Sequence, residues 1–262
     1  MKKGIFFILA LFMLISNGVQ AAPLNDYSKS GTVSLSVSIL HNDFKVREKL
    51  ISGGGIVQHR SLGNKWNISG EVTVTIAPRW AISLDHTSAN ANKKLLGIQP
   101  GVRIQYEKPK LQSTNLKFKY QVYKKDGLFV APYLGISRNR ASLSDDIIDL
   151  GGLGTGNVTL DFKTKAKISP TAGVTIVYDL DKKGSFKTYL DASVGTKMYS
   201  WNVGVSYKIA KNLDFNLGYQ YYQASGLTYN YRKPVPPVTF SGHGEYKIKN
   251  KGIYLGVSYR FN

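Results

Sequence analysis

The ten residues Gly252-Ile-Tyr-Leu-Gly-Val-Ser-Tyr-Arg-Phe261 alternate strictly between two kinds of side chain. Every second residue from Ile253 to Phe261 is apolar or aromatic, and the residues between them are glycine, tyrosine, serine and arginine. Because successive side chains of a β-strand point to opposite faces, this alternation predicts a strand with one apolar face and one face of small or polar groups.

The same alternation occurs immediately upstream, in residues 201–209 and 213–221, on either side of a short turn at 210–212. Apolar and aromatic residues occupy one face of each segment, and asparagine, serine, glycine and glutamine occupy the other. The two segments predict an antiparallel hairpin with one apolar surface. Further strands are expected at residues 32–40, 68–76, 80–87, 116–123, 128–137, 158–178 and 186–194.

Asp126-Gly127 and Lys183-Gly184 are dipeptides typical of tight turns between such strands. The pattern therefore predicts an all-β protein with about ten strands, and eight or twelve strands are the alternatives. Twelve would add a strand at 101–107. No linker rich in proline, serine or glycine divides the chain, so one domain is expected.

No run of about eighteen apolar residues is present beyond the N-terminus, so a membrane location requires a closed barrel, which satisfies its own backbone hydrogen bonds. Loop lengths agree with a barrel: short turns near residues 78, 126, 183 and 211 fall on one side. Longer segments, 43–65, 88–115, 139–157 and 223–250, fall on the other side, where 196–198 is the one short loop. We therefore predict a closed antiparallel transmembrane β-barrel rather than a soluble β-sandwich.

Residues 1–21 have the features of a secretory signal peptide: Lys2 and Lys3, a short apolar stretch, and small residues before Ala21. We expect cleavage near Ala21, which leaves residues 22–262 as the barrel domain. The net charge of +19 becomes +17 without the two N-terminal lysines, and there is no cysteine. An exported basic chain is expected to meet outer-membrane lipid and the phosphates of lipopolysaccharide, not nucleic acid.

Several charged residues are expected to line the lumen, and they allow two interpretations. A basic lumen would favour small anionic solutes in a narrow, porin-like passage. Alternatively, the cations pair with the carboxylates in a filled lumen. Lys163 and Lys165 are expected to rise above the membrane. The predicted lumen residues are Glu71, Asp85, Lys117, Lys119, Lys167, Lys187, Asp191, Asp214 and Arg260.

No catalytic, metal-binding or cofactor-binding residue is expected. The four histidines lack metal-ligand spacing. Asp85 and His86 are adjacent in a strand, so their side chains should point to opposite faces and could not act together. The glycine-rich segment 151–156 is followed by no helix and no Lys-Ser/Thr pair, which argues against a phosphate-binding loop.

The C-terminal strand resembles the assembly signal of outer-membrane barrels, a closing strand of alternating aromatics such as Tyr259 and Phe261. The resemblance implies recognition by the barrel-assembly machinery, although Asn262 follows the final phenylalanine. Repeated aromatic-glycine strands, such as residues 217–221 and 254–261, resemble small barrels of the opacity-protein and OmpA-like group. That resemblance implies a cell outer membrane location with transmembrane β-strands.

Ten strands that rise above the membrane are also similar to the omptin surface proteases. Their catalytic acidic pair and Asp–His pair have no counterpart here: Asp85 has no second inward aspartate beside it, and the loop 196–198 contains neither aspartate nor histidine. We therefore expect a structural or surface-interaction role without catalysis. The alternatives are a narrow anion-favouring porin and, after that, an omptin-like or lipid-modifying barrel enzyme.

Overall fold

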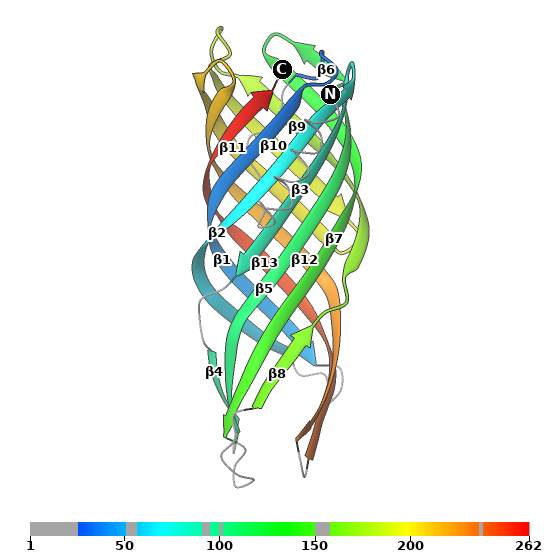
Figure 1. Ribbon diagram of the computed structural model, residues 1–262, viewed down its shortest axis with the longest axis vertical. Coiled ribbons are helices and arrows are strands. Elements are labelled where there is room, and N and C mark those ends of the chain that lie inside the picture. Colours follow the sequence, from blue (N-terminus) through cyan, green and yellow to red (C-terminus); the bar gives the residue numbers. More distant parts are fainter. Residues whose placement is uncertain are drawn as a thin grey trace.

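The computed structural model describes residues 26–50, 57–90, 95–99, 102–149, 158–235 and 238–261, which form one tall closed cylinder (Figure 1). The expected signal peptide, residues 1–21, lies outside the described residues. No helix in the described ranges is long and apolar enough to span a membrane. The strands are β1 (Val33–Leu50), β2 (Val57–Ala77), β3 (Trp80–Asn90), β4 (Leu95–Gln99), β5 (Val102–Tyr120), β6 (Tyr123–Lys125), β7 (Leu128–Asp149), β8 (Val158–Lys163), β9 (Lys167–Asp179), β10 (Phe186–Gly195), β11 (Met198–Ala210), β12 (Leu213–Val235) and β13 (Val238–Phe261).

Ten of these strands form the wall of the barrel, in the order β1-β2-β3-β5-β7-β9-β10-β11-β12-β13. The ring closes where β13 pairs antiparallel with β1 along the whole length of β1. The remaining strands are short additions: β4 pairs with β5, and β6 and β8 pair with β7. The prediction of a closed ten-stranded antiparallel barrel is confirmed. The twelve-strand alternative is wrong because residues 102–107 are the beginning of β5, and the eight-strand alternative is wrong as well.

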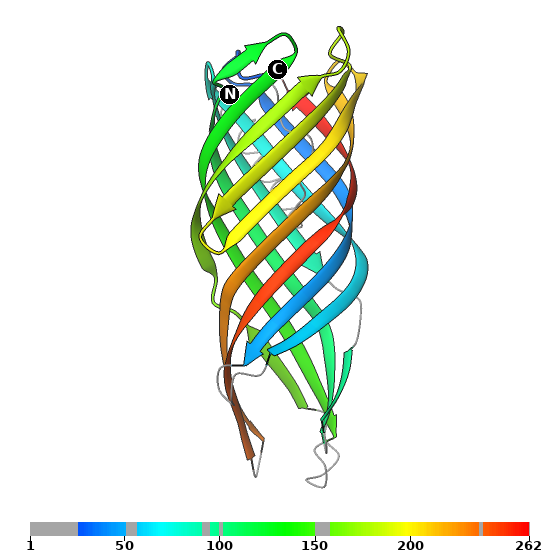
Figure 2. The same cartoon turned by 180° about the vertical axis from the view of Figure 1, so that it is seen from behind.

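The two ends of the cylinder differ: short turns join the strands at one end, and long strands project at the other, as Figures 1 and 2 show. Both ends of the described chain and the turns at 78–79, 126–127, 181–184 and 211–212 lie at one end, which we call the turn end. The other end, the extended end, is formed by the long strands β1, β2, β5, β7, β12 and β13. The hairpin between β10 and β11 turns at 196–197 and stops well short of that rim (Figure 2).

Much of what was expected to be loop is strand. The expected loops 43–65, 88–115, 139–157 and 223–250 all contain strand, and β13 alone has 24 residues. On β1 and β13 the alternation continues above the apolar belt with charged residues on the outer face, so it lacks the apolar signal that marks a lipid-facing strand. The single strand expected at 158–178 is also wrong, because β8 and β9 are separated at 164–166, where Thr164 hydrogen-bonds the backbone of Ala141.

The tight turn at Asp126-Gly127 is confirmed. Both residues have positive φ, 53° and 77°, the conformation of a type I′ hairpin turn. Aspartate and asparagine tolerate that region better than most residues, and glycine has no side chain to oppose it. The dipeptide therefore determines where β6 reverses into β7.

The outer surface carries an apolar belt of the expected kind. On β13, Ile253, Leu255 and Val257 are 57, 41 and 44% exposed, although each is apolar. From Ile253 to Phe261 the strand rises ~27 Å, or ~21 Å of height at a tilt of ~40°, close to the ~25 Å apolar band of outer-membrane barrels. This surface is wide enough to meet the hydrocarbon core of a bilayer.

Aromatic pairs lie at both margins of the belt. Trp80 packs against Tyr120 in a tilted geometry near the turn end, with ring centroids 4.6 Å apart, and Trp201 stacks on Tyr221 toward the extended end, with centroids 5.8 Å apart. Such rings are the interfacial girdles of membrane barrels. The belt and its girdles therefore surround the half of the cylinder next to the turn end, and the extended end projects beyond them.

Candidate functional site

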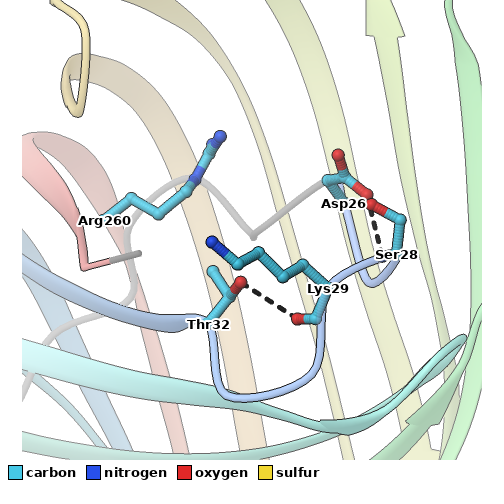
Figure 3. A pocket seen from close by; sticks show the side chains of 5 residues that line it. All are labelled: Asp26, Ser28, Lys29, Thr32 and Arg260. Carbon is cyan, nitrogen blue, oxygen red and sulfur yellow. Dashed lines mark hydrogen bonds between the residues drawn. The ribbon is translucent and has the colours of Figure 1, made fainter.

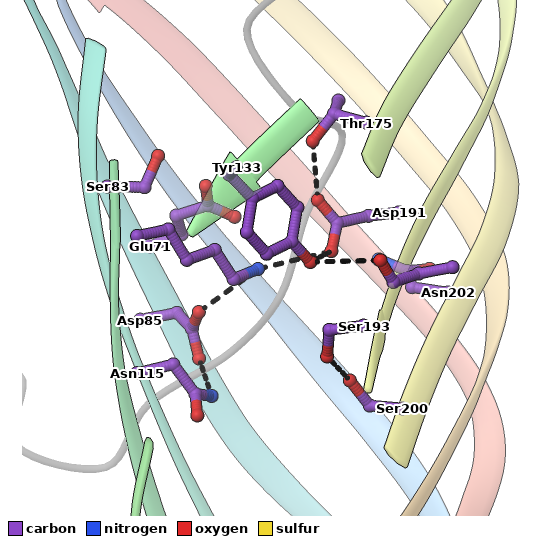
Figure 4. A network of polar contacts seen from close by, with 12 residues as sticks. Glu71, Ser83, Asp85, Asn115, Tyr133, Thr175, Asp191, Ser193, Ser200 and Asn202 are labelled. Carbon is purple, nitrogen blue, oxygen red and sulfur yellow. Dashed lines mark hydrogen bonds and ion pairs between the residues drawn. The ribbon is translucent and has the colours of Figure 1, made fainter. Parts of the chain in front are cut away.

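A cluster of buried charges lies in the interior of the barrel, with Asp191 of β10 at its centre (Figure 4). The Lys117 ammonium from β5 lies 3.1 Å from Asp191 Oδ1 and 3.3 Å from Asp85 Oδ2. The Lys119 ammonium lies 3.4 Å from Glu71 Oε1 and 3.7 Å from Asp191 Oδ2. Each lysine therefore bridges two carboxylates, and Asp191 touches both lysines.

Neutral donors complete the coordination of these carboxylates. Tyr133 and Thr175 donate hydrogen bonds to Asp191 over 2.8 and 2.7 Å. Asn115 donates to Asp85 over 2.6 Å. The cluster holds two lysines and three carboxylates, so its formal charge is −1. Sequence reasoning expected a basic lumen, and at this level the cations are instead outnumbered by paired carboxylates.

Tyrosines fill the interior at several heights, and each faces a glycine on the neighbouring strand. The register pairs Tyr133 with Gly173, Tyr189 with Gly204, Tyr254 with Gly218, and Tyr229 with Gly244. A Cβ atom at any of these glycines would collide with the opposing tyrosine. The glycines thus create the space that the rings occupy, and a tyrosine hydroxyl network forms: Tyr254 donates to Asn202 and shares a hydrogen bond with Tyr189.

The segment before β1 closes on the same interior from the turn end. Tyr27 is fully buried, and its ring packs edge to face on Phe129 with centroids 5.1 Å apart. The Tyr27 amide donates to Gln121 Oε1, and its carbonyl accepts a hydrogen bond from the Arg79 amide over 2.8 Å. The alternation pattern could not indicate this contact, because Tyr27 is outside any strand.

A cavity of about 280 Å³ opens beside this segment, lined by Asp26, Ser28, Lys29, Thr32 and Arg260 (Figure 3). Burial alone would raise the pKa of Asp26, but hydrogen bonds from Lys124 and Ser28 outweigh it and hold that pKa below its usual value. The ion pair between Asp26 and Lys124, 2.8 Å long, therefore links the segment before β1 to the turn end of the barrel.

The other predicted lumen residues lie outside the cluster. Arg260 Nη2 is 3.9 Å from Asp214 Oδ2 near the turn end, and the charges of both act on Lys187, which is half-buried. Lys167 is half-buried near Gly226 on the opposite side of the membrane belt.

The two aromatic residues of the expected assembly signal are exposed on the outer surface. Tyr259 and Phe261 are 42 and 45% exposed and pack edge to face. Lys163 and Lys165 are exposed. Asp85 points inward, whereas His86 is half-buried with its Nδ1 2.8 Å from Thr114 Oγ1, so the two side chains do not meet. In the described ranges, no three potential metal ligands come together.

Sequence reasoning missed a set of basic residues on the outer face of β1 and β13. These six residues, which we call the basic seam, are Lys45, Arg47, Lys49, Lys247, Lys249 and Lys251. The signal was available as two matching patterns, Lys-x-Arg-x-Lys at 45–49 and Lys-x-Lys-x-Lys at 247–251. It was overlooked because both segments were expected to be loop, to which no face can be assigned.

Known protein structures share this barrel architecture. The chain matches OmpT, an outer membrane protease of Escherichia coli, with a TM-score of 0.52, 14% identity, and coverage of 91% of this chain and 99% of that chain. It matches the outer membrane protein OprG of Pseudomonas aeruginosa with a TM-score of 0.43, 14% identity, and coverage of 89 and 97%. Comparison with curated protein sequences gave no match.

A family model extends over nearly the whole chain. The model described as outer membrane protein beta-barrel domain matches residues 7–261, a range that contains all ten strands of the ring. The solved structures are too distant in sequence to show more than the fold. The chain therefore belongs to the outer membrane protein beta-barrel family, which implies a location in the outer membrane.

Proposed function

We propose that this protein is a non-catalytic outer-membrane barrel with a closed lumen, whose role is structural and whose extended end interacts with its surroundings. The observation that carries this proposal is the burial of the charged cluster: Lys119 and Asp85 are 0% exposed, and Lys117 is 4% exposed. Charged groups on the wall of a water-filled pore would be hydrated. Their complete burial supports a lumen without a continuous column of water.

The pairing of the cluster also disfavours the anion-favouring porin. Selectivity by sign requires unpaired charge on the pore wall. Lys117 and Lys119 each contact two carboxylates, so neither presents a free positive charge to a passing anion. The interior tyrosines that face glycines, together with Tyr27, occupy further interior volume on the same path.

The absence of catalysis is supported by where the three carboxylates of the cluster lie. General acid–base chemistry on a surface substrate needs a titratable group within hydrogen-bond reach of that substrate. Asp85, Asp191 and Glu71 are buried among lysines and tyrosines, and His86 lies on the other face of its strand.

In the proposed topology, the turn end of the barrel faces the periplasm. Residues 1–21 are removed during export, and the assembly machinery recognises Tyr259 and Phe261.

Single-channel recording in planar bilayers tests the closed lumen. The refolded mature protein should give no stable conductance steps, although it inserts, as shown by folded and boiled samples migrating differently on a gel. Asp126→Asn changes an exposed turn and serves as the control: it should insert like the native protein and give no conductance steps. Stable anion-selective steps would contradict the proposal and support the porin, and hydrolysis of peptide or lipopolysaccharide that is lost in Asp85→Ala would establish the enzyme.

A further inference from the structure

The basic seam lies where the first and last strands close the ring, and its residues face one another. β1 and β13 run side by side toward the extended end (Figure 2). The register places Lys45 opposite Lys249 and Arg47 opposite Lys247. Directly opposed side chains have Cβ atoms ~5 Å apart, and like charges in that relation destabilise a sheet. Two consecutive like-charged pairs are therefore a cost that the fold itself does not explain.

Two carboxylates share this face and neutralise only part of its charge. Asp43 Oδ2 lies 3.7 Å from the Lys45 ammonium and 3.9 Å from the Lys251 ammonium, so one carboxylate serves two lysines. Glu245 is opposite Lys49 in the register. Among the side chains that the structure describes, no carboxylate lies within 4.0 Å of Arg47, Lys247 or Lys249. Six cations against two carboxylates leave a formal charge of +4.

The height of the seam on the barrel restricts what can neutralise it. On β13 the outward residues change from Ile253, which is 57% exposed, to Lys251, Lys249 and Lys247 within one strand repeat. On β1 the same change follows Ile39, which is 50% exposed, and the ring contact between His41 and Trp66. The cations thus begin directly above the apolar belt and its aromatic margin, at the level of the lipid headgroups.

We propose that the basic seam binds the phosphate groups of lipopolysaccharide in the outer leaflet. A lipid whose acyl chains lie against Ile39, Ile253 and Leu255 would bring its phosphorylated headgroup to the seam. Phosphate oxygens accept charge-assisted hydrogen bonds from lysine and, in a forked geometry, from arginine. A phosphate between Arg47 and Lys247 converts their repulsion into two attractions, which explains why like charges are tolerated there.

This inference rests on the proposed role in surface interaction, and its test does not involve the lumen. The probe is bisphosphorylated lipid A, titrated into the refolded mature protein in neutral detergent and followed by native mass spectrometry. The seam variant combines Arg47→Gln, Lys247→Gln and Lys249→Gln. Its control combines Lys182→Gln, Lys183→Gln and Lys211→Gln, three exposed lysines at the turn end.

The native protein and the control should bind lipid A equally, and the seam variant roughly a hundredfold more weakly, since each headgroup-level cation contributes about a fivefold gain. Lipid A without phosphates should bind the native protein as weakly as lipid A binds the seam variant. Should the triple variant fail to fold, Arg47→Gln alone is expected to weaken binding about fivefold.

Three results would overturn the proposal. Equal binding of lipid A by the native protein and the seam variant would show that other residues hold the lipid. Equal binding of phosphorylated and dephosphorylated lipid A would show that the headgroup charge is not recognised. Displacement of lipid A by equimolar inorganic phosphate, or tighter seam-dependent binding of a sulfated polysaccharide, would identify a soluble anion instead. Each of these results leaves the conductance test unaffected, so the two proposals can fail separately.

Discussion

Replacement of Lys119 by methionine is expected to lower the free energy of unfolding by about 3–5 kcal/mol, as removal of one partner from a buried ion pair does. Lys119 is fully buried and contacts Glu71 and Asp191. Without it, Lys117 still contacts Asp85 and Asp191, but Glu71 loses its lysine and keeps the Thr73 hydroxyl, 3.0 Å away, as a hydrogen-bond donor. Methionine preserves most of the side-chain volume, so the loss reports charge rather than a cavity.

Denaturant unfolding in lipid vesicles, followed by tryptophan fluorescence, measures this change. Lys125→Met is the matched control, because its side chain is 73% exposed and its loss should change stability by less than about 1 kcal/mol. Adding Glu71→Gln to Lys119→Met should restore much of the stability, since the formal charge of the cluster then returns from −2 to its native −1. A loss below about 1 kcal/mol for Lys119→Met would show that water reaches the cluster.

Replacement of Gly218 by valine is expected to destabilise the barrel by about 2–4 kcal/mol, through overpacking and the loss of hydrogen bonds. A Cβ at Gly218 would lie 2.6 Å from the Val203 carbonyl oxygen and would collide with the ring of Tyr254. Tyr254 would have to move, which breaks its hydrogen bonds with Asn202 and Tyr189.

The same unfolding measurement applies to this variant, with Leu217→Val as the control on the neighbouring, lipid-facing position. Leu217 is 43% exposed, so this smaller change should have little effect. A double-mutant cycle of Gly218→Ala and Tyr254→Ala should show strong coupling, because the added methyl group then fills space that the ring has left. Additive effects would mean that Tyr254 does not pack on Gly218.

The sequence was most informative where the barrel meets lipid. The alternation in residues 201–221 and 252–261 predicted both the strands and their outward faces, because a lipid-facing strand must be apolar on every second residue. The turn at Asp126-Gly127 was predictable for a local reason, the positive φ of both residues. These features depend only on neighbours in the chain.

Pairing inside the lumen was not predictable in the same way. The alternation indicated that Lys117, Asp85 and Asp191 point inward, but not that they meet. Their contact depends on the register of every strand between β3 and β10, since a shift in one pair changes the height of all residues beyond it. The basic seam was missed because its alternation is between charged and other residues, a pattern without an apolar face.

The chain contains no cysteine, so single cysteines can report the two sides of one strand. On β2, Ile68 is 50% exposed on the outer face, and the adjacent Ser69 is fully buried inside. In proteoliposomes, Ile68→Cys should react with a lipid-soluble maleimide and not with a charged one, and Ser69→Cys should react with neither until the protein is denatured. Rapid reaction of Ser69→Cys with the charged reagent would reveal a water-filled lumen and contradict the closed barrel.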